Sequence, residues 1–159
     1  MRKVLVILVS VVALGLGSTW AQGDITLGAS AGFPYAAAHV SIADLAAGLD
    51  VRANVVFALS DYGGGDSSGF GVGADVLYGL DFDLGIDVDV YAGAGATFTF
   101  GTDQVALLNA FIGGTYPLDV SGMSGLSLFA EVGPGFTITA PGDNILVPVA
   151  RVGVNFELQ

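Results

Sequence analysis

The chain has 159 residues, a formal net charge of −11, no cysteine and a mean hydropathy of +0.74. This composition is more apolar than that of an ordinary soluble domain, and its acidity repels phosphate backbones, which excludes nucleic acid as a partner. The lack of cysteine and the single histidine exclude disulfides and zinc sites built mainly from those residues.

The N-terminal segment has the three parts of a secretory signal peptide. Arg2 and Lys3 precede an apolar run over residues 4–17, and the small residues that follow end in a cleavage motif at Ala21. An uncleaved anchor helix is the alternative, but the apolar run is shorter than the roughly 20 residues that span a bilayer. We therefore predict an exported protein with two parts: a signal peptide over residues 1–21 and a mature domain over residues 22–159.

From Asp24 onward, apolar and polar residues alternate with a period of two, which predicts β-strands with two different faces. The pattern predicts eight strands, over residues 25–33, 36–42, 49–59, 70–80, 84–100, 106–118, 126–138 and 146–158. Short connections are expected at 44–48, 81–83 and 119–125, and the longest loop at 60–69.

The residue types on the polar face indicate which face lies inside. That face consists mainly of Gly, Ser, Thr and Ala with a few charged residues, whereas a soluble sheet would present many long charged side chains to water. Small residues suit a narrow lumen, and the apolar face is too large for the interior of a small barrel. We predict an all-β fold, an eight-stranded antiparallel up-and-down transmembrane β-barrel. A soluble lipocalin-like binder, with the apolar face lining a cavity, is the alternative.

An eight-stranded barrel is just wide enough for side chains to fill it, so the charged residues of the polar face are expected to meet. Hairpin register places Asp75 opposite Asp89, Arg52 within diagonal reach of Asp75, and Glu131 near Arg151. The predicted lumen network contains His39, Arg52, Asp75, Asp87, Asp89, Glu131 and Arg151. Its acids outnumber its bases, and a salt-bridge plug is expected, with a narrow cation-favouring conduit or ion site as the alternative.

The last predicted strand, RVGVNFEL, resembles the C-terminal β-signal of bacterial outer-membrane proteins. The residues that carry the resemblance are Arg151, Gly153, Phe156 and Leu158. It implies delivery by periplasmic chaperones and insertion by the barrel assembly machinery. The mature chain also resembles the small OmpA/OmpX-type barrels in size and pattern, which implies an outer-membrane location among lipids. The function we expect first is a structural or surface-interaction role there.

Other functions are weighed against this interpretation. A narrow channel or a transporter of small solutes or hydrophobic ligands is the main alternative. His39 and Ser41 resemble the His and Ser pair of the lipid A deacylase PagL, but both are expected to face the lumen, with Arg52 nearer to His39 than any carboxylate. We therefore expect no catalytic residue, no cofactor and no metal site.

Overall fold

The computed structural model describes residues 24–46, 48–58, 69–82, 84–100, 104–121, 124–139 and 144–158. The predicted signal peptide and nearly all of the predicted loop at 60–69 lie outside the described residues. No helix among the described residues is long and apolar enough to cross a membrane.

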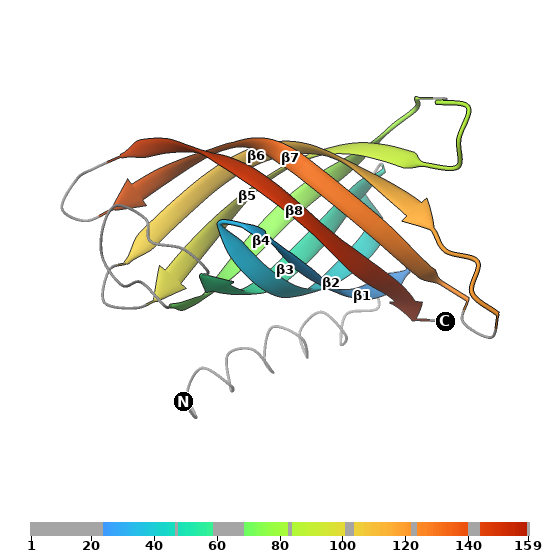
Figure 1. Ribbon diagram of the computed structural model, residues 1–159, viewed down its shortest axis with the longest axis horizontal. Helices are drawn as coiled ribbons and strands as arrows, with labels where there is room; N and C mark the ends of the chain where they lie inside the picture. Colours follow the sequence, from blue (N-terminus) through green and yellow to red (C-terminus); the bar gives the residue numbers. More distant parts are fainter. Residues whose placement is uncertain are drawn as a thin grey trace.

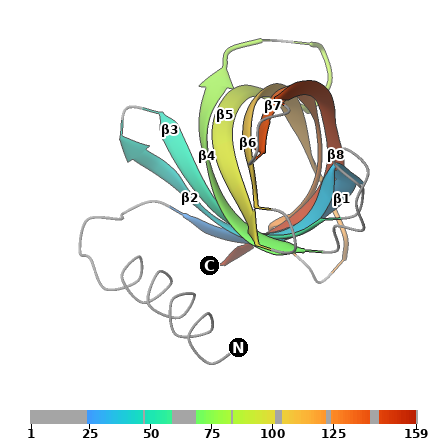
Figure 2. The same cartoon turned by 90° about the vertical axis from the view of Figure 1, so that its left-hand side faces the viewer.

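Eight antiparallel strands form a single closed barrel (Figures 1 and 2). The strands are β1 (Ile25–Phe33), β2 (Tyr35–Ala46), β3 (Leu49–Ala58), β4 (Phe70–Leu80), β5 (Asp89–Phe100), β6 (Val105–Pro117), β7 (Leu126–Thr139) and β8 (Ile145–Leu158). Each strand pairs with the next in sequence, and β8 closes the barrel on β1 with Ile25 opposite Leu158. The predicted all-β, eight-stranded antiparallel up-and-down architecture is confirmed.

The predicted start of the fifth strand at Leu84 is wrong, because β5 begins at Asp89. Residues 84–88 alternate as a strand does, but pairing with β6 begins at Asp89, opposite Thr115, and pairing with β4 begins at Val90, opposite Leu80. The connection between β4 and β5 therefore covers residues 81–88. It carries exposed apolar side chains, with Ile86 66% exposed.

The two faces of the barrel wall differ as the alternation predicts. On β8, Val152 is 63% exposed and its neighbour Arg151 is 3% exposed. The exposed outward-facing side chains on the strands include Leu27, Phe33, Leu49, Phe57, Phe70, Val72, Val76, Tyr78, Phe98, Phe100, Leu108, Ile112, Tyr116, Leu128, Val132, Phe136, Ile138, Leu146, Val152, Val154, Phe156 and Leu158. Among the described strand residues, the one charged side chain outside the inward phase is Asp44, at the irregular pairing between Ile42 and Ala46.

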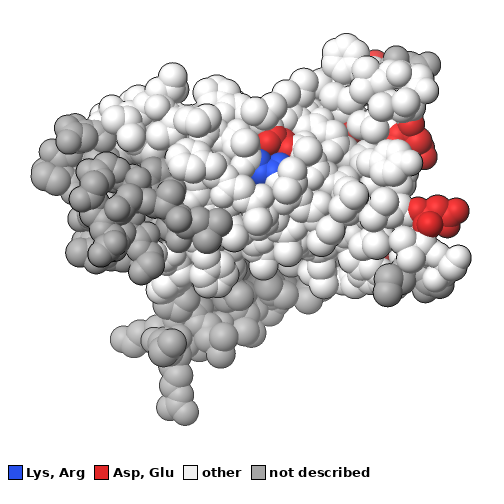
Figure 3. Space-filling view, in the orientation of Figure 1, with Lys and Arg blue, Asp and Glu red and all other residues white. Residues whose placement is uncertain are grey.

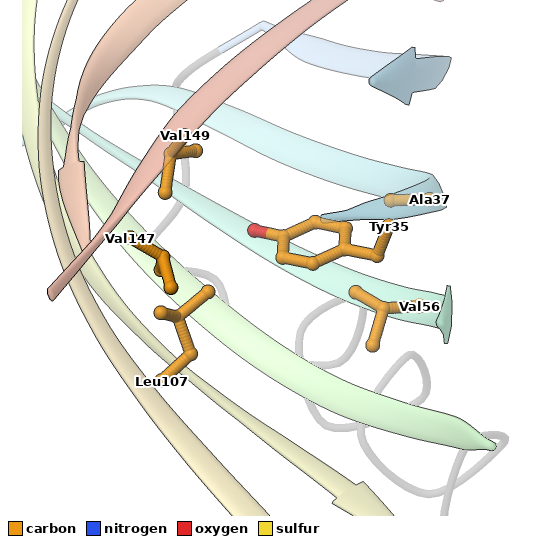
Figure 4. Close-up of a cluster of buried hydrophobic side chains, with 6 residues drawn as sticks. All are labelled: Tyr35, Ala37, Val56, Leu107, Val147 and Val149. Atoms are coloured by element: carbon orange, nitrogen blue, oxygen red, sulfur yellow. The ribbon is translucent and has the colours of Figure 1, made fainter. Parts of the chain in front are cut away.

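In the view of Figure 3, the wall is uncharged except at one small hollow, where basic and acidic atoms are visible, and acidic residues gather at one end. We call this the terminal end, because β1 starts and β8 ends there; the opposite end, where residues 59–69 connect β3 to β4, is the loop end. Toward the loop end, the lumen is filled by an apolar cluster (Figure 4). Its members are Tyr35, Ala37, Val56, Leu107, Val147 and Val149.

Glycines facing the lumen make room for the large side chains beside them. A Cβ on Gly113 would lie 2.6 Å from the Tyr91 ring and 2.8 Å from Glu131 Cγ, closer than packed atoms allow. Gly153 lies against the ring of Phe129 in the same way. The glycine-rich inward face is thus what allows a narrow barrel to hold charged and aromatic residues in its interior.

Candidate functional site

Four charged side chains from four strands meet in the middle of the lumen. We call them the ionic cluster: Arg52 of β3, Asp75 of β4, Glu131 of β7 and Arg151 of β8. Arg52 is the direct register partner of Asp75, and Glu131 that of Arg151. Sheet pairing therefore positions two acid-base pairs, and closure of the barrel brings the pairs together.

Glu131 is the most heavily hydrogen-bonded group in the cluster. Arg52 donates from Nη1 to Oε1 at 2.7 Å and from Nη2 to Oε2 at 3.2 Å. Arg151 donates from Nε to Oε2, and the Tyr91 hydroxyl donates to Oε1 at 2.7 Å. These charge-assisted bonds offset the cost of burying the carboxylate, which is 4% exposed as a residue.

Asp75 takes all its hydrogen bonds on one oxygen. Its Oδ2 accepts from Arg52 Nε at 2.9 Å, Asn54 Nδ2 at 2.9 Å and Arg151 Nη2 at 3.3 Å. The residue is 1% exposed. Each arginine thus binds both carboxylates, and the two positive charges balance the two negative ones.

Aromatic rings pack around both guanidinium groups. The Phe111 ring centroid lies 5.5 Å from Arg52 Cζ and 4.8 Å from Arg151 Cζ. Arg151 also donates from Nη1 to the Tyr35 hydroxyl at 2.9 Å, which connects the ionic cluster to the apolar cluster on the loop side. These contacts fix the arginines and leave the middle of the lumen filled by side chains.

The structure brings together Arg52, Asp75, Glu131 and Arg151 of the seven predicted network residues. His39 faces the lumen toward the terminal end, where it hydrogen-bonds to Asn155 at 2.9 Å and packs edge-on against Phe129. In the β2–β3 ladder, His39 is paired with Asn54 and Ser41 is paired with Arg52.

Asp87 and Asp89 do not join the cluster, since both are exposed, Asp87 in the β4–β5 connection and Asp89 at the start of β5. The expected pairing of Asp75 with Asp89 is wrong: Asp75 lies opposite Gly95. The later start of β5 causes this difference, because it lengthens the turn and changes the register. With these two acids outside, the expected excess of acids over bases in the network is also wrong.

Sequence reasoning did not single out Asn54, Tyr91 and Phe111 as cluster partners, although all three lie on the inward phase of their strands. The alternation of inward and outward residues was the one feature of the sequence that could have identified them, and it placed Tyr91 on the polar face. For Tyr35 the sequence is misleading, because an aromatic residue at a strand end suggests the barrel exterior. In the structure Tyr35 is 2% exposed and points inward (Figure 4).

The residues of the predicted assembly signal occupy both faces of β8. Arg151 and Gly153 face the lumen, while Phe156 and Leu158 lie on the exterior and are 43% and 44% exposed. Within the described part of the chain, no group of three or more His, Asp or Glu side chains is arranged to hold a metal ion.

Known proteins offer few points of comparison. No protein-family model matches the chain, and no curated protein matches its sequence. Among solved structures, the chain is similar to a major outer membrane protein from Thermus thermophilus, with 20% sequence identity and a TM-score of 0.46. The similarity covers 86% of this chain and 99% of the other.

Proposed function

We propose that the protein is an integral outer-membrane β-barrel with a sealed lumen and a structural or surface-interaction role. One observation carries this proposal: large apolar side chains are exposed on the outward face of a closed barrel, while the charged strand residues are on the inward phase of their strands, Asp44 excepted. A patch of this size would be unfavourable against water and is stable against lipid.

The backbone supports the same location. In hydrocarbon every backbone N–H and C=O must find a protein partner, and a closed barrel is the β-structure that meets this requirement. Pairing of β1 with β8 leaves the sheet without a free edge. In the view of Figure 3, the exposed acidic side chains of the described residues gather at the terminal end, where water would reach them. A soluble lipocalin-like binder would need the reverse arrangement, with the apolar face around an internal cavity.

The filled lumen favours a structural or surface role over transport. A solute entering from the loop end would meet the apolar cluster and then the ionic cluster, whose four charged groups are held to one another. A cation-favouring conduit needs a surplus of negative charge along a wet path, and the charges here cancel. Surface residues at the two ends of the barrel are then the part available to partners.

The geometry around His39 favours a non-enzymatic role. A hydrolytic serine needs a histidine that is oriented by an acid, and His39 is bonded to the amide of Asn155 instead. Ser41 faces Arg52 across the β2–β3 ladder. We propose that this pair belongs to the lumen packing.

Insertion by the barrel assembly machinery, after passage with periplasmic chaperones, is part of the same proposal. Phe156 and Leu158 present apolar side chains outward from the last strand, where a membrane-embedded receptor could bind them. Arg151 and Gly153 face the lumen, where Gly153 leaves room for the Phe129 ring.

Cell fractionation tests the proposal. The protein should sediment with outer membranes on a density gradient and stay there after washes with high salt and with carbonate. Recovery in the soluble periplasmic fraction would refute the proposal. Unboiled samples should migrate differently from boiled samples on a denaturing gel, since a closed barrel resists the detergent until it is heated.

A further inference from the structure

Five buried polar atoms in the lumen lack a hydrogen-bond partner among the described residues. They are Asn54 Oδ1, Asp75 Oδ1, Thr97 Oγ1, Asn109 Nδ2 and Asn109 Oδ1. The four residues that carry them are between 1% and 6% exposed. We call these four residues the unpartnered patch.

The sheet register places the four residues on two adjacent rows of the lumen wall. In one row, Gly95 separates Asp75 from Asn109. In the other row, Gly73 separates Asn54 from Thr97. The Thr97 hydroxyl lies 2.7 Å from the point where a Cβ on Gly73 would stand, and Asp75 Oδ1 lies against Gly95 in the same way. Two of the unpartnered atoms, Thr97 Oγ1 and Asp75 Oδ1, therefore occupy the room that these two neighbouring glycines leave on the lumen wall.

Buried polar atoms rarely remain unpaired, because such an atom has lost its hydrogen bonds to water and gained none from the protein. Asn109 is the strongest case, since both ends of its amide lack a protein partner. Asp75 is the next, because Oδ2 receives three hydrogen bonds and Oδ1 receives none. Buried water typically makes about three hydrogen bonds to such groups.

The charges and donors around the patch select water over a cation. Arg52 and Arg151 already balance Asp75 and Glu131, so a cation would add positive charge beside two guanidinium groups. The Asn109 amide nitrogen is a hydrogen-bond donor, and its partly positive hydrogens would repel a cation. A water molecule can accept from that nitrogen and donate to the carboxylate oxygen of Asp75.

We propose that the unpartnered patch is a buried hydration site in which ordered water joins Asp75 Oδ1 to the Asn109 amide, with Asn54 and Thr97 completing its hydrogen bonds. The site explains why a carboxylate with one bare oxygen is stable in a closed lumen. It concerns the interior alone and holds whether or not the exterior faces lipid.

Nuclear magnetic resonance of the isotope-labelled protein in detergent micelles tests the proposal in the native sequence. We expect cross-peaks between water and the side-chain amide protons of Asn109. The methyl groups of Val56 and Val149 in the apolar cluster, both 0% exposed, are the dry reference and should show none. An Asn109 amide that shows no contact with water, alongside a well-dispersed spectrum of the folded barrel, would overturn the proposal.

A crystal structure at high resolution is the second test of the proposal. Asn109→Leu is the matched variant, because the leucine side chain has a similar shape and no polar atoms. Solvent density bonded to Asp75 and Asn109 is expected in the parent protein and should be lost or displaced in the variant. Soaking crystals in a rubidium or thallium(I) salt should give no anomalous peak there. Such a peak, or direct protein bonds to the Asn109 amide without solvent, would contradict the assignment.

Discussion

Arg52 of β3 and Arg151 of β8 share the same two carboxylates, those of Asp75 and Glu131, across the interior of the barrel. One acid-base pair is made between neighbouring strands on each side, and the two remaining contacts cross the lumen. The barrel is therefore cross-linked through its centre by groups that are costly to bury separately.

Removing one carboxylate should leave the two arginines underpaired. Glu131→Gln keeps the shape of the side chain but loses the charge that both guanidinium groups bind, so the free energy of unfolding should fall by about 3–5 kcal/mol. This free energy can be measured by urea titration of the protein in lipid vesicles. The folded and unfolded fractions are read from their separate bands on a gel of unboiled samples.

The exposed acid Asp87 provides the control for this experiment. Asp87→Asn removes a charge in the β4–β5 connection, and its effect should stay within about 0.5 kcal/mol. Equal losses in the two variants would mean that Glu131 contributes nothing specific to the folded state.

Adding a methyl group at Gly113 should overpack the lumen. In Gly113→Ala the new Cβ would collide with Tyr91 and Glu131, and a loss of about 1–3 kcal/mol is expected. Gly79→Ala is the matched control, because Gly79 also faces inward on a strand but a Cβ there meets no atom within 4 Å. Similar stabilities for the two variants would contradict the packing described here.

A positive charge on the exterior should oppose folding into lipid. Val152 lies outward beside Arg151, at the level of the ionic cluster, so Val152→Lys should destabilise the barrel in vesicles by about 2–4 kcal/mol if this level is near the bilayer midplane. Val120→Lys, at an exposed site in the β6–β7 connection, should change stability little. An indifferent Val152→Lys would argue that this face meets water.

The lumen should not conduct ions. In planar lipid bilayers the protein is expected to give no discrete current steps, because the apolar and ionic clusters fill the interior. Asp89→Asn should behave like the parent protein, since Asp89 is exposed at the start of β5. Cation-selective steps that disappear in Asp89→Asn would instead support a conduit.

The strands and their faces were predictable because alternation is a property of each segment by itself. β1 and β4 have the predicted bounds, while β5 starts five residues later than predicted. That error arose because alternation alone does not show where pairing begins: β5 pairs with β6 from Asp89 and with β4 from Val90.

The site was predictable only where it follows from hairpin register. Glu131 beside Arg151 follows from the β7–β8 turn, and Arg52 beside Asp75 from adjacent strands. The bonds from Arg52 to Glu131 and from Arg151 to Asp75 cross the lumen, so they depend on how the closed barrel is staggered. Neutral partners such as Phe111 and Asn54 carry no charge to mark them in the sequence.

The most direct test is site-directed spin labelling along β8 in lipid vesicles, which is practical because the chain has no cysteine. Single cysteines at Ala150, Val152 and Val154 should give labels that collide with oxygen dissolved in the bilayer and avoid a water-soluble nickel complex. Labels at Val147 and Val149, which face inward on β8, should be protected from both reagents, giving a period of two along the strand. Outward labels that collide freely with the nickel complex and little with oxygen would contradict a lipid-facing exterior.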